Sequence, residues 1–312
     1  MDARIYNQYV LKIAECGSLT KAAEALNISQ PALSQGLNAL EKEIGIRIFN
    51  RRSVPIAFTQ EGNLYYDFIR RSEILGADFR RRLSALQGEA DESVTIGSAV
   101  AYTASTVPEA VMSLKKIMPQ CRIAIKSAPL DDLITMAEEG KINCFISTTD
   151  RLPDQFEKVK IKNERVYLVI PSSDPVNNSL QPFRKRGGER EHVPELTDYS
   201  FLSGRQMIFL ESGQPLQEMI SAFLRKNRIA TENSITVDQV SAALSLAIKG
   251  AGICFASDES LSACDPGENV CIYSLPDAVF GRGIYLAYSR ELYMPKACRV
   301  LIDLWKNHTG NI

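Results

Sequence analysis

Two short amphipathic helices, joined by a turn of three residues, are predicted near the start of the chain. The first opens at Ser18, a residue type that favours helix N-caps, and its apolar residues recur at helical spacing: Leu19, Ala22, Ala23 and Leu26. Residues 27–29 form the turn. Pro31 suits the first turn of the next helix, because its missing N–H would have no helical partner there. The short turn predicts that the two helices pack against each other.

The second predicted helix, residues 30–44, separates apolar from polar side chains. At 100° per residue its large apolar side chains fall within about 60° of one another, and they are Leu33, Leu37, Leu40 and Ile44. The opposite face carries Gln30, Pro31, Ser34, Gln35 and Asn38. Amide and hydroxyl groups hydrogen-bond the edges of base pairs, and such a helix fits the major groove. An ordinary amphipathic helix pair has the same periodicity and remains an alternative.

The next segment predicts a short β-hairpin, or wing, around an Arg-Arg-Ser-Val-Pro turn. The strand-like apolar residues on its two sides are Ile46, Ile48 and Phe49, then Ile56 and Phe58. Net charge is −1 for the whole chain, but residues 47–52 hold three arginines and no acid. Such a patch favours contact with phosphates. We therefore predict a winged helix-turn-helix DNA-binding domain over residues 1–60.

Residues 61–91 are predicted to form a linker helix, because the segment has no proline and Gly88 is its first convincing break. Apolar residues recur in it at steps of four and seven, a heptad-like pattern that we call the apolar seam: Leu64, Phe68, Leu75, Phe79 and Leu86. A helix of roughly 28 residues is ~40 Å long, more than a small domain covers. The seam therefore predicts dimerisation through a partner helix, with packing inside its own domain as the alternative.

From residue 92 to residue 312 the pattern changes to alternating short strands and helices, which predicts an α/β domain with parallel strands. Predicted strands include 94–99, 121–128, 143–147, 165–171, 206–211 and 234–238. The polar stretch 172–192 is predicted to be a solvated loop, after which the α/β pattern restarts. We predict two lobes with a cleft between them, lobe I over 92–166 and 272–312 and lobe II over 167–271.

Composition argues against catalysis and metal binding. The two histidines, His192 and His308, lie far apart, and the seven cysteines include no C-x-x-C pair. We therefore expect no enzyme, no metal, no cofactor and no disulfide framework. No stretch approaches the ~20 apolar residues that a membrane span needs, and charged residues interrupt the first 25 positions. We expect a cytoplasmic protein without membrane contact.

The segment 18–62 resembles the signature of LysR-type transcriptional regulators. The shared motifs are A-A-x-x-L, S-Q-P-A-L-S, L-E-x-x-I-G and T-x-x-G, and I-F-N-R stands in place of the usual L-F-x-R. The rest of the chain resembles the family in order: a linker helix, then a two-lobed effector domain similar to the type 2 periplasmic binding fold. Gln35 and Asn38 stand where many members carry Arg, and Asn143 replaces a usual Asp. The family's operator preferences therefore do not transfer.

The resemblance implies a sequence-specific regulator whose partners are double-stranded operator DNA, a small-molecule effector, further copies of itself as a homodimer or homotetramer, and RNA polymerase. Bases would face Gln30, Pro31, Ser34, Gln35 and Asn38. The other DNA-binding residues that it implies, at phosphates or the minor groove, are Ser18, Thr20, Ser29, Arg51 and Arg52.

The effector is expected to be a small organic acid held between the lobes. Ligands of such α/β sheets bind beyond the carboxyl ends of strands, where helix N-termini favour anions. The expected effector-binding residues are Ser98, Ala101, Tyr102, Thr103, Ser127, Leu130, Ser212 and Gly213. As an alternative role, Ser98 and Ser212 would only cap their helices.

Two other functions remain as alternatives. A thiol-based redox-sensing regulator would resemble the peroxide-sensing members of the family, but these rely on two cysteines around the segment corresponding to 205–218, which has none here. A cytosolic enzyme or solute-binding module on the two-lobed fold would need a nucleophile–base pair or a phosphate loop. The G-x-G of residues 249–255 follows a predicted helix and precedes a strand, the wrong order for dinucleotide binding.

Overall fold

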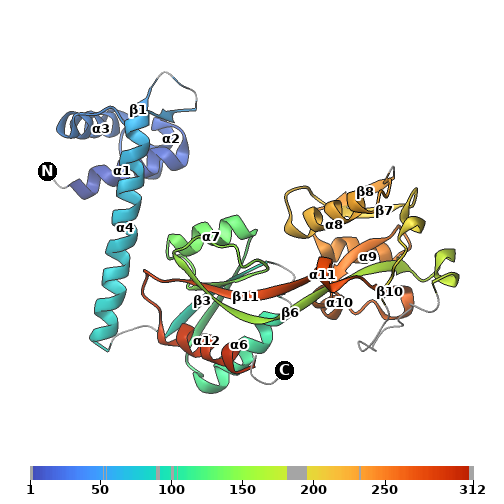
Figure 1. Ribbon diagram of the computed structural model, residues 1–312. Helices are drawn as coiled ribbons and strands as arrows, with labels where there is room; N and C mark the ends of the chain where they lie inside the picture. The colour runs from blue at the N-terminus through green and yellow to red at the C-terminus, as the bar shows by residue number, and fades with distance from the viewer. Residues whose placement is uncertain are drawn as a thin grey trace. The chain divides into compact units, whose positions relative to one another are not determined.

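The structure is a computed structural model that describes residues 3–51, 53, 55–88, 92–99, 102–103, 105–180, 195–231 and 233–308. The chain divides into two compact units, Met1–Ala90 and Asp91–Ile312 (Figure 1). None of the helices in these ranges combines the length and apolar character that a membrane crossing requires.

The first unit begins with three helices, α1 (Ala3–Cys16), α2 (Leu19–Ala25) and α3 (Gln30–Ile44). Both predicted N-caps are present: Ser18 Oγ accepts from the N–H of Lys21, and Ser29 Oγ accepts from that of Ala32. Gly45 ends α3 at a φ of +75°, a conformation that favours glycine. The helices share one core, which contains Val10, Ile13, Ala22, Ala23, Leu33, Leu37, Leu40, Ile48, Phe49 and Ile69. The predicted helix-turn-helix is confirmed.

The wing is shorter than predicted. Its strands β1 (Phe49–Asn50) and β2 (Ala57–Phe58) are antiparallel, and the Phe49 and Phe58 rings stack with centroids 4.8 Å apart. Ile48, expected in the first strand, instead donates its N–H to Glu41 and accepts from the N–H of Thr59. The backbone of Ile48 therefore joins α3 to the start of α4 rather than extending the hairpin.

Helix α4 (Gln60–Leu86) starts at Thr59, whose Oγ1 accepts from the N–H of Gly62 at 2.9 Å. A Cβ on Gly62 would lie 1.9 Å from the carbonyl oxygen of Ile48, so only glycine fits the T-x-x-G motif here. Ile69 is buried in the core of the unit. The apolar seam, by contrast, is 63–86% exposed within the single chain. In the described chain the seam therefore does not pack inside its own domain, which was the alternative to dimerisation.

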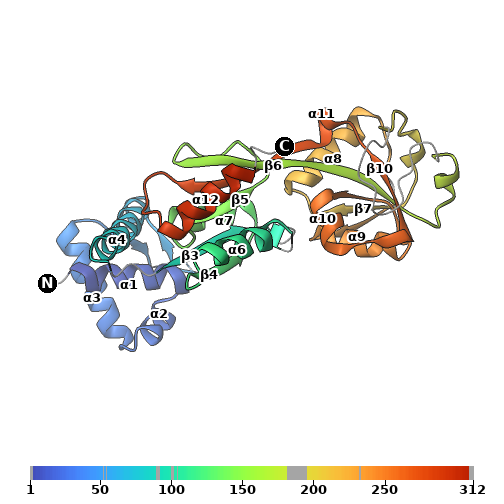
Figure 2. The same ribbon diagram turned by 90° about the horizontal axis from the view of Figure 1, so that it is seen from below.

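The second unit contains the predicted βαβαβ arrangement. Strands β3 (Ser93–Ser98), β4 (Arg122–Ser127) and β5 (Cys144–Ser147) are parallel in the order β5-β3-β4. Helix α6 (Thr106–Ile117) follows β3, and α7 (Leu130–Glu138) follows β4. The closing helix α12 (Lys296–His308) packs against α6 and shares its core, whereas α7 packs around Phe145 in a separate cluster (Figure 2).

The predicted strand 165–171 is in fact the end of a much longer strand, β6 (Phe156–Pro171). Its first ten residues pair with β11 (Gly281–Ser289), and its last six pair with β9 (Cys254–Ser257) and β10 (Val270–Ser274), all antiparallel. The sheet is therefore mixed rather than purely parallel. The first half of β6 escaped prediction because three of its residues are charged and exposed: Glu157, Lys158 and Lys160.

Beyond β6 the second unit has another core. Strands β7 (Met207–Leu210) and β8 (Ser234–Val237) are parallel, and helices α8 (Pro215–Lys226) and α9 (Val240–Ile248) pack against them. Helix α10 (Asp258–Cys264) packs against α9, β6 and β9. Short helical turns that were not predicted lie at Pro175–Asn178, Ser200–Leu202, Gly267–Asn269 and, as α11, Asp277–Phe280. The rings of Phe223, Phe255 and Phe280 meet in this core, which therefore extends to the end of α11.

Candidate nucleic-acid interface and effector site

Helix α3 presents the polar face that the sequence predicts. Its inner side buries Leu33, Leu37 and Leu40. The opposite side exposes Gln30, Pro31, Gln35 and Asn38, and Ser34 is half-buried. One inner position was missed: Gly36 is buried, and a Cβ there would lie 2.6 Å from the ring of Tyr9. A larger residue at this position would displace the Tyr9 ring, because α1 and α3 pack against each other here.

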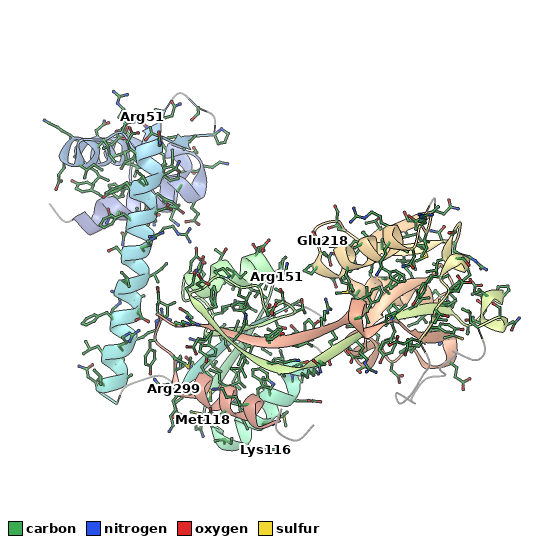
Figure 3. The ribbon with its side chains drawn as sticks, in the orientation of Figure 1. Arg51, Lys116, Met118, Arg151, Glu218 and Arg299 are labelled. Carbon is green, nitrogen blue, oxygen red and sulfur yellow. The ribbon has the colours of Figure 1, made fainter. Side chains whose placement is uncertain are left out.

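The residues expected at phosphates differ in their exposure and in the hydrogen bonds that they make. The hydroxyls of Ser18 and Ser29 act as helix caps, whereas Thr20 in the first turn of α2 is exposed. Arg51 lies at the end of the wing strand β1 and is labelled in Figure 3. Arg52 lies outside the described residues. Free N–H groups and hydroxyls at helix starts are common phosphate partners, so this arrangement suits a duplex backbone.

Arg51 contacts two side chains of α3. Its Nη2 donates to Asn38 Oδ1 at 2.5 Å and to Glu41 Oε2 at 2.9 Å. The other carboxylate oxygen of Glu41 accepts from the backbone N–H groups of Ile48 and Phe49. Glu41 therefore ties α3 to the wing, a role that sequence reasoning did not assign. The L-E-x-x-I-G motif contained the residue, but only the fold shows what it binds.

The expected effector segments at the carboxyl ends of β3 and β4 lie together. The hydroxyls of Thr103 and Ser127 are 3.1 Å apart, and the carbonyl of Ser98 accepts from the N–H of Ala128 at 3.3 Å. Ser98 itself is fully buried, and Leu130 is the half-buried first residue of α7. Ala101 lies outside the described residues.

The other expected effector residues, Ser212 and Gly213, occupy the exposed turn between β7 and α8, where Gly213 has a φ of +90°. Helix α8 takes Gln214 as its N-cap residue and α6 takes Ser105. Ser98 is therefore not the N-cap of α6, and Ser212 is not the N-cap of α8.

Tyr102 belongs to a buried cluster with Glu164 of β6 and Arg282 of β11. Its hydroxyl lies 2.8 and 2.9 Å from the two carboxylate oxygens of Glu164, and Arg282 pairs with that carboxylate. The side chain of Tyr102 is 4% exposed and Glu164 is fully buried. Burial raises the pKa of the tyrosine hydroxyl well above its usual value. Burial also lowers the pKa of Arg282, but Tyr102 and Glu164 outweigh this effect, so its pKa is raised.

A second charged group joins α6 to α10 across the two cores. Glu259 of α10 accepts from Thr106 Oγ1 at 2.9 Å and pairs with Lys162 of β6. Burial works to raise the pKa of Glu259, but hydrogen bonds from Lys162, Ser105 and Thr106 lower it overall. Burial, together with the charges of Glu164 and Glu259, raises the pKa of Asp258 to about 6. These charged residues were not predicted, because the sequence shows them as ordinary polar positions of a strand and a helix.

The described thiols have the features of packing residues. All seven cysteines lie in the described part of the chain. Five of them are buried, and none of the seven forms a disulfide bond. A hydrogen bond with Cys298, followed by burial, raises the pKa of Cys144 well above its usual value. Burial raises the pKa of Cys254 to about 12. The described residues include no group of three or more His, Cys, Asp or Glu arranged to hold a metal ion.

Comparison with known proteins gives the family. Residues 7–63 match the family described as "Bacterial regulatory helix-turn-helix protein, lysR family", and residues 87–310 match "LysR substrate binding domain". A hydrogen peroxide-inducible genes activator of Dickeya chrysanthemi is 26% identical over 217 residues, 69% of this chain and 66% of that protein. The regulator YjiE of Escherichia coli K12 is 25% identical over 169 residues, 53% of this chain and 54% of that protein. The chain thus spans about two thirds or less of the length of these relatives.

Solved structures share the fold. CbnR complexed with its target DNA superimposes with a TM-score of 0.65 at 18% identity, over 99% of this chain and 100% of that chain. A full-length OxyR variant from Pseudomonas aeruginosa gives a TM-score of 0.66 at 16% identity, over 96% of this chain and 93% of that chain. The prediction of a regulator rather than an enzyme is confirmed by the family matches. Because these matches cover most of residues 7–310, the chain belongs to the LysR family of bacterial transcriptional regulators, DNA-binding proteins with an effector-binding domain.

Proposed function

We propose that this regulator reads operator DNA with the exposed polar face of α3 and responds to a small organic anion bound in its second unit. The observation that carries the DNA part is the exposure of Gln35 and Asn38 beside Arg51, since amide side chains read base edges and arginine meets phosphate. The solved CbnR complex supports it, because that protein, which shares the fold, is bound to its target DNA.

Replacing Gln35 with alanine is expected to relax base preference, because it removes an exposed amide from the face of α3. Affinity for the preferred site should fall by about tenfold, the order expected for one lost base contact. The measurement is selection from randomised duplexes followed by salt-titrated binding. Arg52→Ala is the contrasting variant, expected to weaken all sequences alike and to reduce the salt dependence. Equal selectivity of Gln35→Ala and the unaltered protein would refute the role of Gln35.

The apolar seam is proposed to pair two subunits through α4, so that a dimer presents two copies of α3 to half-sites about 10.5 bp apart. Five large apolar side chains that are 63–86% exposed on one helix support this proposal. Pairing of effector domains would then give the homotetramer that the sequence resemblance implies.

Leu75→Asp is expected to dissociate the α4 pair, because it places a carboxylate in a dry interface where an unpaired charge is costly. Arg80→Asp is the matched control: Arg80 is also exposed, but it lies about 140° away from Leu75 around the helix. Light scattering at several protein concentrations measures the mass of each variant. A Leu75→Asp protein with the mass of the unaltered protein would show that the seam is not the interface.

The effector is proposed to bind beyond the carboxyl ends of β3 and β4, where the hydroxyls of Thr103 and Ser127 lie together a few residues before α6 and α7 begin. Thr103→Trp is expected to fill this position and abolish thermal stabilisation by whichever member of a panel of carboxylic acids stabilises the unaltered protein. Operator binding should persist, because α3 belongs to the other compact unit. An undiminished thermal response in Thr103→Trp would remove this site from consideration.

A thiol-based peroxide sensor is the second candidate, since several matched relatives are named hydrogen peroxide-inducible genes activators. Thiolates rather than thiols react with peroxide, and buried thiols of raised pKa form thiolates poorly. Cys144 and Cys254 fit that inert description. The burial and raised pKa of these two cysteines thus favour the small-molecule effector.

A further inference from the structure

The segment between β3 and α6 carries Thr103, the proposed effector contact, next to the buried Tyr102. The N–H groups of both residues donate to the carbonyl of Ala99, at 3.1 and 3.2 Å, so the two residues share one helical turn. Neighbouring side chains on such a turn point about 100° apart. Thr103 accordingly meets Ser127, whereas Tyr102 is 4% exposed and its hydroxyl donates to Glu164. Tyr102 is therefore placed to hold Thr103 in position rather than to touch an effector.

Glu164 lies where β6 changes partners. The strand pairs with β11 before this point and with β9 from Val166 onward. We call residues 162–166 the crossover, because β6 passes there from the core of α6 and α12 to the core of α8. Arg282 of β11 stands directly opposite Glu164, and its guanidinium also donates to the Tyr102 hydroxyl at 3.1 Å. The Tyr102 anchor thus ends at the crossover.

A second anchor starts at Thr106, the first residue of α6. Its Oγ1 donates to Glu259 of α10 at 2.9 Å, and Glu259 also pairs with Lys162. Lys162 and Glu164 are two positions apart on β6, so their side chains leave the same face of the strand. Helix α10 packs with α9 through Leu261, in a core that is separate from that of α6. The second anchor therefore joins the effector segment to a helix of another core.

We propose that Tyr102 and Thr106 are positioning residues of the effector site, which fasten the segment that carries Thr103 to the crossover and, through Glu259, to α10. The segment and α10 then undergo local opening together. The inference rests on the proposed effector site beyond β3 and β4, and adds how binding there reaches another core. A segment that is already held in place costs an effector less to order. By linkage, an effector that holds the segment also stabilises α10.

Hydrogen–deuterium exchange of the full-length protein without any ligand tests the link to α10. Thr106→Val removes the hydroxyl but keeps the shape of the side chain. Amide exchange should become about fivefold faster both in α10 and at residues 102 and 103, the effect of one lost hydrogen bond. Thr106→Ser keeps the hydroxyl and should retain slow exchange in both places. Glu259→Gln weakens the same contact from the other core, and should speed exchange in both places as well.

Tyr288→Phe is the matched control for Tyr102→Phe. Tyr288 is 8% exposed, and its hydroxyl binds Glu157 at 2.7 Å, which is also a contact between β11 and β6. Tyr102→Phe should speed exchange at residues 102 and 103 about fivefold. The control loses a similar hydrogen bond but should leave this exchange unchanged. A purely structural role of the Tyr102 hydroxyl would not produce this difference.

Calorimetric titration with acetate, succinate and benzoate, which are carboxylates of different size, tests the consequence for effector binding. Any of them that the unaltered protein binds should bind about fivefold more weakly to Tyr102→Phe and to Thr106→Val, because both variants lose a contact that orders the segment. Its affinity for Tyr288→Phe should be unchanged. The same carboxylate should slow exchange in α10 of the unaltered protein, and far less in Thr106→Val.

Two results would overturn the inference. One is exchange in α10 that is the same in Thr106→Val, Glu259→Gln and the unaltered protein. The other is a carboxylate that binds Tyr102→Phe and Thr106→Val as tightly as it binds the unaltered protein. If none of the three carboxylates binds the unaltered protein, the exchange rates still decide whether the segment and α10 are linked, and the proposed effector class is what fails.

Discussion

Gly62→Ala is expected to destabilise the unit Met1–Ala90 severely. The added Cβ would lie 1.9 Å from the carbonyl oxygen of Ile48 and 2.7 Å from its carbonyl carbon. These are backbone atoms, and they cannot move freely because the N–H of Ile48 is bound to Glu41 and its carbonyl to Thr59. We expect a loss of about 3 kcal/mol or more, at the upper end of overpacking effects, out of a typical total stability of about 5–15 kcal/mol.

Gly76→Ala is the matched control on the same helix. The nearest atom to its new Cβ would be Arg80 Nη1 at 3.7 Å, an ordinary contact. Alanine favours helices over glycine by roughly 0.5–1 kcal/mol, so this variant should be slightly more stable than the unaltered protein. Urea denaturation followed by far-ultraviolet circular dichroism measures both. Equal stability of the two variants would mean that Ile48 shifts at little cost.

Arg282→Met is expected to destabilise the second unit by about 3–5 kcal/mol, because it leaves the fully buried Glu164 carboxylate without its cation. Tyr102→Phe is the milder comparison. It removes one hydroxyl partner but keeps the ion pair, and should cost about 1 kcal/mol. Thermal denaturation of the unaltered protein and both variants at pH 7.5 tests this order of effects.

Two further measurements separate a charge effect from lost packing. Lowering the pH should reduce the difference in stability between Arg282→Met and the unaltered protein, because the folded variant gains stability when a proton neutralises the Glu164 carboxylate that has lost its cation. Adding Glu164→Leu should restore much of the lost stability, since the double variant contains no buried charge at this position. If Arg282→Met cost no more than Tyr102→Phe, the ion pair would contribute little to the fold.

The sequence by itself determined the elements that depend on neighbouring residues. Ser18, Ser29, Gly45 and Thr59 mark helix ends through hydrogen bonds or backbone conformations within a few residues of each position. The polar face of α3 and the βαβαβ start of the second unit follow from the period of apolar residues, which is likewise local. The candidate DNA-reading residues could therefore be proposed from the sequence, together with the family's order of parts.

Only the tertiary structure decided the contacts between residues far apart in the chain. Glu164 and Arg282 are separated by 118 positions, and neither has a local pattern that shows it will be buried with Tyr102. The partners of Glu41 are only seven to ten positions away, but they lie beyond the end of α3, and only the fold turns its carboxylate toward the wing, where it binds Arg51. The physical reason is that caps and periodicity are short-range properties of the chain, whereas the partner of a charged side chain is set by which elements fold against each other.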